Sequence, residues 1–257
     1  MLADLVAGAL ADASERRVEF SLGEVEAAAL ARTPALDAIS ALAPRDAVHV
    51  IAEIKRASPS RGALAPIADP ASLAAEYEAG GASAISVLTE GRRFGGSLAD
   101  LEAVRDAVSV PVLRKDFIAE PYQVFEARAA GADLVLLIAA ALDDSTMASL
   151  FLLVNELGMT PLVETHCADE VDRALDLGAD LIGVNARDLT TFELDQHLFG
   201  RLAGMIPTGV IRVAESAVTT AADVAHYRRA GADVVLVGEA LVTNGDPAAT
   251  LREFLAS

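Results

Sequence analysis

Short runs of aliphatic residues recur along the chain at near-regular intervals, and glycine or polar residues bound each run. Short runs that are apolar throughout are typical of parallel strands buried on both faces. The segments between them are rich in alanine, with apolar positions at helical spacing. The runs predict eight strands, near residues 48–54, 84–88, 111–114, 133–138, 160–164, 180–184, 210–214 and 233–237.

The tripeptide Gly-Ala-Asp or Gly-Ala-Ser precedes four of these strands, with copies that begin at Gly81, Gly131, Gly178 and Gly231. Glycine at such a place ends a helix in a left-handed conformation. Each interval between copies holds one further strand, so the repeating unit is one strand followed by one helix. Helices are predicted, for example, over residues 97–108, 120–130, 143–157, 168–177 and 219–230.

Eight strand–helix units predict a (β/α)8 barrel. A doubly wound sheet also alternates strands and helices and is the structural alternative. The regular unit, and the lack of a GxGxxG motif after the first strand, favour the barrel. Residues 1–45 precede the first strand and have helical patterns over 1–15 and 21–31. We therefore expect a single α/β barrel domain over residues 1–257, of which 1–45 form an N-terminal helical extension.

Polar residues gather where the predicted strands end. In a (β/α)8 barrel the active site lies at the carboxyl ends of the strands. Glu53 and Lys55 are two residues apart and so point to the same side of the first strand. Such clusters perturb pKa values and supply general acids and bases. A ring of ion pairs that only fills the barrel is the structural alternative. The remaining strand-end residues include Thr89, Glu90, Lys115, Asp116, Glu164, His166, Asn185, Arg187, Glu215, Ser216 and Glu239.

Lysine is nearly absent from the chain. The 20 basic residues comprise 18 arginines and only Lys55 and Lys115. Guanidinium stays charged, whereas a partly buried ammonium can lower its pKa and give up a proton. We therefore expect the two lysines to have a task that arginine cannot perform.

Charge and composition exclude several classes of function. The net charge of −18 argues against a nucleic-acid partner or an anionic membrane surface. The longest apolar stretch, 134–142, falls short of the roughly 20 residues that span a bilayer. Asp4 and the lack of a basic leader argue against a signal peptide, and the single Cys167 fits a reducing cytosol. We expect a cytoplasmic protein without metal or cofactor, and a monomer, although an oligomer stays open.

Two loops indicate a phosphate ligand. VAESAV follows the seventh strand and VGEAL the eighth, where small residues allow a ligand to approach the backbone. Phosphate sites of such barrels often lie at these two loops, and helix N-termini favour anions. With Ser58-Pro59-Ser60 at the same end of the barrel, a small phosphate monoester is the expected ligand.

Six ordered blocks resemble the indole-3-glycerol phosphate synthase family, from about residue 48 to the end of the chain. The blocks are IAEIKRASPS at 51–60, SVLTE at 86–90, LRKDF at 113–117, VETH at 163–166, GVNARDL at 183–189 and VAES at 213–216. The resemblance implies tryptophan biosynthesis, with 1-(2-carboxyphenylamino)-1-deoxyribulose 5-phosphate as substrate. This compound closes to indole-3-glycerol phosphate with loss of carbon dioxide and water.

The resemblance also implies roles for individual residues. Lys115 resembles the general acid of ring closure, and Glu164 resembles an acid/base in the dehydration. Lys55, oriented by Glu53, would hold the departing carboxylate, and the division of acid roles between the two lysines stays open. The catalytic set is completed by Asn185, Glu215 and Ser216. Substrate and phosphate contacts are implied for Ser58, Phe94, Phe117, Leu137, Arg187, Leu189, Ala217, Gly238 and Glu239.

Two positions depart from the family pattern. Ala217 stands where the family usually has glycine, and Ala57 where it often has a basic residue. If position 217 needs a positive φ, alanine there costs about 1 kcal/mol. Two rival functions remain: a phosphoribosyl isomerase, which would use an Asp or Cys acid/base pair, and a catalytically silent barrel. A specialised role in making another indole product also stays open.

Overall fold

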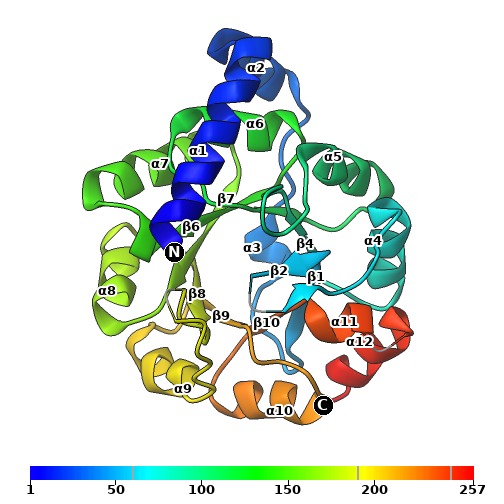
Figure 1. Ribbon diagram of the computed structural model, residues 1–257. Helices are drawn as coiled ribbons and strands as arrows, with labels where there is room; N and C mark the ends of the chain where they lie inside the picture. The colour runs from blue at the N-terminus through cyan, green and yellow to red at the C-terminus, as the bar shows by residue number, and fades with distance from the viewer. Residues whose placement is uncertain (60, 190, 244) are drawn as a thin grey trace.

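Eight parallel strands close into a barrel in the order β1-β10-β9-β8-β7-β6-β5-β4 (Figure 1). The computed structural model describes residues 1–59, 61–189, 191–243 and 245–257, so Ser60 of the expected phosphate loop lies outside the described residues. The strands are β1 His49–Ile54, β4 Ala84–Leu88, β5 Val112–Lys115, β6 Leu134–Ile138, β7 Thr160–Thr165, β8 Leu181–Asn185, β9 Ile211–Glu215 and β10 Val234–Val237. The closed barrel confirms the prediction and excludes the doubly wound alternative.

Helices follow the strands around the outside of the barrel. They are α4 Pro70–Ala79, α5 Leu98–Ala107, α6 Pro121–Ala129, α7 Asp144–Glu156, α8 Ala168–Asp176, α9 Leu198–Leu202, α10 Ala221–Arg229, α11 Glu239–Thr243 and α12 Pro247–Leu255, with two 3-10 turns, Ala139–Ala141 and Ala203–Met205. Side chains at Asp69, Ser97 and Asp143 accept hydrogen bonds from the first turns that follow them. Such caps satisfy backbone N–H groups that have no partner within the helix.

A short hairpin interrupts the loop after β1 and was not expected from the sequence. Its strands are β2 Ala57–Ser58 and β3 Gly62–Ala63, which pair antiparallel. Two-residue strands carry no recognisable alternation of apolar and polar positions, which explains why the pattern gave no sign of them. The hairpin places Ser58 beside the barrel mouth.

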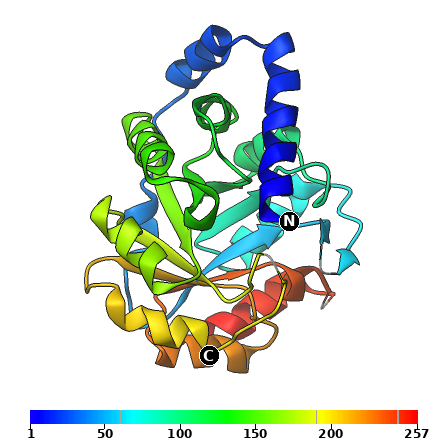
Figure 2. The same ribbon diagram turned by 60° about the vertical axis from the view of Figure 1, so that its left-hand side comes forward.

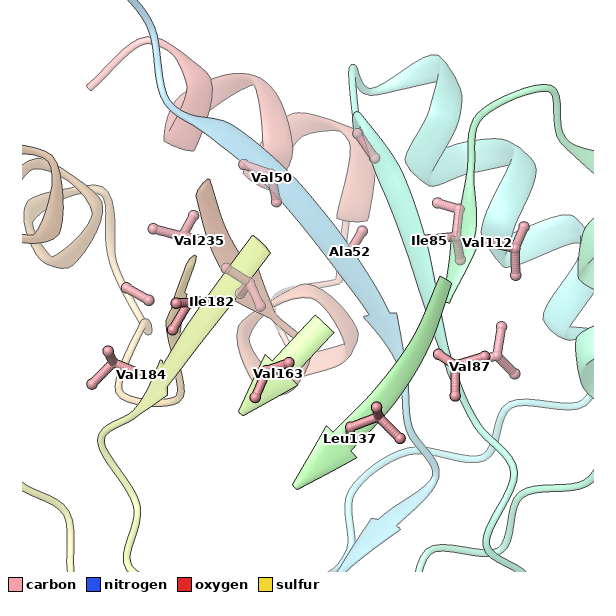
Figure 3. Packing of buried hydrophobic residues seen from close by; sticks show 14 of the residues in the cluster. Val50, Ala52, Ile85, Val87, Val112, Leu137, Val163, Ile182, Val184 and Val235 are labelled. Carbon is pink, nitrogen blue, oxygen red and sulfur yellow. The ribbon is translucent and has the colours of Figure 1, made fainter. Parts of the chain in front are cut away.

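Side chains on each strand alternate between the barrel interior and the helical layer. Ile51, Leu113 and Leu162 point inward and form the inner cluster. Outward residues such as Val50 and Val163 pack beneath the helices (Figure 3). This alternation decides which strand-end residues face the mouth.

The N-terminal extension comprises α1 Leu2–Glu19, α2 Leu22–Ala31 and α3 Ala38–Ala41. The chain starts near the barrel mouth, and α1 runs outward to α2, which lies beyond α6 (Figures 1 and 2). Leu5 packs with the inner cluster. Arg16 binds Glu126 of α6 through Nε and Nη2, at 2.5 and 2.7 Å. No helix in the described part of the chain is long and apolar enough to cross a membrane.

Candidate active site

A cavity opens at the carboxyl ends of the barrel strands, where sequence reasoning expected the site. Of the predicted site residues, all but Leu137 line it: Glu53, Lys55, Ser58, Phe94, Lys115, Phe117, Glu164, Asn185, Arg187, Leu189, Glu215, Ser216, Ala217, Gly238 and Glu239. These residues come from seven of the eight strands or the loops that follow them. The barrel therefore brings together groups that are up to 186 positions apart in the chain, from Glu53 to Glu239.

Glu53 and Lys55 form an ion pair on one wall of the cavity. Lys55 Nζ lies 2.5 Å from Glu53 Oε1, and Glu53 is only 3% exposed. Gly238 on the neighbouring β10 leaves room for that carboxylate, because a Cβ at this position would lie 2.6 Å from Glu53 Oε1. Glycine 238 is thus needed here for close packing around a buried charge.

Lys115 ends β5, two strands from β1 in the barrel, and lies close to two buried glutamates. Its Nζ is 3.4 Å from Glu164 Oε2 and 3.6 Å from Glu215 Oε2. Burial alone would lower the pKa of this lysine. The carboxylates of Glu164, Glu215 and Glu53 outweigh burial and raise the pKa of the ammonium. The expectation of a lowered pKa is therefore wrong for Lys115, which is a firmly charged donor held by three acids.

Glu164 and Glu215 share one buried environment but differ in charge. Burial favours the neutral form of both. For Glu164 the charge of Lys115 outweighs burial, with help from His166 and from Asn185, and its pKa is lowered. For Glu215 burial dominates, the Glu164 charge adds to it, and the pKa rises to about 8. At neutral pH one carboxyl is ionised and its neighbour carries a proton.

Asn185 links the acid/base pair to the loop after β9. Its Nδ2 donates to Glu164 Oε1 at 3.0 Å, while its Oδ1 accepts from Ser216 Oγ at 2.8 Å and from the Arg187 backbone N–H at 3.0 Å. The orientation of the amide is therefore determined at both ends. Ser216 and Ala217 adopt φ values of 66° and 59°, a left-handed backbone that alanine rarely takes. Position 217 is the one flagged in the sequence, and it does have a positive φ.

The apolar wall of the cavity differs from the prediction at one residue. Leu137 is fully buried on the outer face of β6, beneath the helices, and does not reach the cavity (Figure 3). Its neighbours Leu136 and Ile138 point inward and line the cavity instead. Phe94 and Phe117 lie as predicted, with ring centroids 6.1 Å apart.

Arg61, Leu5 and His166 are among the residues at or next to the site to which sequence reasoning gave no role. Arg61 in the loop after β1 lines the cavity, and its Nη2 lies 3.3 Å from Glu239 Oε1. Leu5 reaches the cavity from α1. It is far from the other site residues in the sequence, so no local pattern indicates that it belongs to the site. His166 stood among the strand-end polar residues but was given no role. Arg61 could have been found from the sequence, because it is a basic residue only three positions after Ser58.

Fold and site together define a (β/α)8 barrel of the enzyme type, with a cavity lined by buried acidic and basic side chains at the carboxyl ends of its strands. Within this class, the chain belongs to the indole-3-glycerol phosphate synthase family, whose model matches residues 2–254. A relative of that name from Leifsonia xyli subsp. xyli is 72% identical over 254 residues, covering 99% of this chain and 97% of its own. Another from Beutenbergia cavernae is 57% identical, covering 100% and 95% respectively. Family membership decides against the phosphoribosyl isomerase alternative.

Solved structures with low sequence identity share the fold. A 3-hexulose-6-phosphate synthase has a TM-score of 0.63 and 22% identity, covering 81% of this chain and 99% of its own. A thiamine phosphate pyrophosphorylase from Pyrococcus furiosus has a TM-score of 0.60 and 14% identity, covering 80% and 93%. At these identities the likeness concerns the barrel alone.

Proposed function

We propose that this chain closes 1-(2-carboxyphenylamino)-1-deoxyribulose 5-phosphate to indole-3-glycerol phosphate. The new bond joins the ring carbon that bears the carboxylate to the ketone carbon of the sugar. The carboxylate leaves as carbon dioxide, and the former ketone oxygen leaves as water. The observation that carries the proposal is Lys115 between Glu164 and Glu215 in the cavity, within 3.4 and 3.6 Å of their oxygens.

Lys115 serves as the general acid of ring closure. The ketone oxygen becomes a strongly basic alkoxide as the new bond forms, so an ammonium with a raised pKa can still protonate it. The buried side chains of Glu53, Glu164 and Glu215 surround the ammonium and hold it at one place, which lowers the cost of orienting the donor. Lys115 then takes a new proton from solvent or from Glu215, which is protonated at neutral pH.

Glu164 serves as the base of the dehydration, because its ionised form is the stable one in this site. It removes the proton that must leave before the indole ring becomes aromatic. Asn185 holds Glu164 Oε1 at 3.0 Å and so orients the carboxylate. The other polar side chains around the reacting atoms are those of Glu53, Ser216 and Glu215.

Lys55 and Arg187 bind the anthranilate carboxylate, since they supply cationic groups to a strongly acidic protein. Phe94, Phe117 and Leu189 enclose the aromatic ring. The phosphate binds at Ser58 and at the loops after β9 and β10, through Ala217, Gly238 and the Glu239 backbone. Arg61 adds a cation at that end, since its contact with Glu239 at 3.3 Å leaves the guanidinium half-exposed to an incoming phosphate.

Incubation of the purified protein with the carboxyphenylamino-deoxyribulose phosphate tests this proposal. We expect an indole absorbance, a product mass lower by one carbon dioxide and one water, and one carbon dioxide released per product formed. Binding of the substrate without turnover would instead support the catalytically silent barrel.

A further inference from the structure

His166 lies two residues beyond Glu164 and is held by two carboxylates. Its Nε2 is 3.3 Å from Glu164 Oε1, and its Nδ1 is 3.2 Å from Glu170 Oε2 at the start of α8. The backbone N–H of His166 also donates to Glu170 Oε2 at 2.7 Å. A carboxylate oxygen therefore lies within ion-pair distance of each ring nitrogen, and the hydrogen bond is made through Nδ1 to Glu170.

His166 does not touch the substrate cavity. It is absent from the described residues that line the cavity, although its partner Glu164 is one of them. Burial alone would lower the pKa of this histidine, but the two carboxylates outweigh burial and raise the pKa to about 10. A cationic side chain thus lies beside Glu164 without lining the cavity.

The position of this charge gives the carboxyl groups of Glu164 and Glu215 different electrostatic surroundings. Lys115 lies at nearly equal distances from both, 3.4 Å from Glu164 and 3.6 Å from Glu215. The lysine therefore attracts each carboxylate to a similar extent and does not by itself decide which one is ionised. Neither oxygen of Glu215 has a hydrogen-bond partner in the described part of the chain, whereas Glu164 accepts a hydrogen bond from Asn185 and lies at ion-pair distance from His166.

We infer that His166, held by Glu170, is a positioning residue that keeps Glu164 ionised and leaves the shared proton on Glu215. This assignment rests on the proposed role of Glu164 as the base. The groups that face the pair are Lys115 on β5 and Glu53 on β1, together with His166 itself. Of the two cations, Lys115 lies at similar distances from Glu164 and Glu215. His166 is the one that lies close to Glu164 but not to Glu215.

Loss of the imidazolium should raise the pKa of Glu164. An opposite charge at this range lowers a carboxyl pKa by about 1–3 units, so His166→Gln raises the pKa of Glu164 by about that amount. The base then takes up its proton at a higher pH. The acid limb of the kcat profile, followed from about pH 8 down to about pH 4, should therefore lie about 1–3 pH units higher in the variant than in the parent. KM should change little, because His166 lies outside the cavity.

The experiment compares kcat and KM over that pH range in the parent, His166→Gln and Glu170→Gln. Glutamine keeps a donor at position 166 without the charge. Glu170→Gln is the second test should the first variant fold poorly, and it should move kcat in the same direction by weakening the imidazolium. The matched control is His197→Gln, at an exposed histidine before α9, and this variant should match the parent. Coincident kcat profiles in the parent and both variants would overturn the inference.

Magnetic resonance of the imidazole carbons provides a readout that does not depend on turnover. The His166 signal, identified by its loss in His166→Gln, should remain that of an imidazolium at about pH 8 in the parent, beyond the ordinary titration range of histidine. A neutral imidazole at that pH would overturn the inference even with an active enzyme. If the parent fails to turn over the substrate, the proposed function fails, while this measurement still decides the charge of His166.

Discussion

Gly183 on β8 leaves space for a buried acid of the site, and filling that space should inactivate the enzyme. A Cβ built on Gly183 would lie 2.1 Å from Glu215 Oε1 and 3.2 Å from Glu215 Cδ. Non-bonded carbon atoms prefer separations of about 3.5–4.0 Å, so in Gly183→Ala the carboxyl must move by more than about 1 Å. The backbone of Gly183 does not need a positive φ, so the added methyl is the main perturbation.

The displaced carboxyl loses its place beside Lys115, at present 3.6 Å away. A misplacement of about 1 Å in a catalytic arrangement costs about 100-fold in rate, which is the fall in kcat that we expect. Overpacking of a buried site costs about 1–3 kcal/mol, and replacing a strand glycine regains part of that. The free energy of unfolding should therefore fall by only about 1 kcal/mol, and the variant should fold.

Steady-state kinetics and urea unfolding of the same preparation separate the two effects. Gly204→Ala is the matched control, since a Cβ there meets no atom within 4 Å. It should keep the parental kcat. A Gly183→Ala variant that folds and retains kcat within about threefold of the parent would refute the requirement for Glu215 at its present position.

Two further predictions concern the loop after β9 and the buried acid. Ala217→Gly should relieve a backbone held at φ 59°, at a strain of about 1 kcal/mol, and lower KM by up to about fivefold; an unchanged or higher KM would show that the loop already accommodates alanine. The raised pKa of Glu215 means that its contribution to stability is present below its ordinary pKa of 4.5 and is lost as the pH rises through about 8. Melting temperatures at about pH 6 and pH 9 should therefore fall less in Glu215→Gln than in the parent, and an equal fall in both would contradict the assignment.

The strands and their order could be predicted because buried parallel strands are continuous aliphatic runs. The same uniformity explains the error at Leu137. A strand that is apolar on both faces does not reveal which residues point inward, and β6 has no polar residue to mark the positions that face the barrel interior. On β1 and β7, Glu53 and Glu164 supply that mark, and there the inward positions were predicted correctly.

The electrostatics of the site could not be predicted from the sequence, because they depend on several strands at once. The raised pKa of Lys115 arises from carboxylates on β1, β7 and β9, which only the closed barrel brings together. His166 likewise gains its charge from Glu164 on the preceding strand β7 and from Glu170 on the following helix α8. Arg61 lies between the two strands of a hairpin that is too short to leave a pattern in the sequence.

The most direct test of the central claim is the single-turnover rate of ring closure in Lys115→Arg. Arginine keeps the positive charge between Glu164 and Glu215 but does not release a proton under these conditions. The account predicts a rate lower by a factor on the order of 100 or more, with substrate still bound. A rate close to that of the parent would contradict the role of Lys115 as the proton donor.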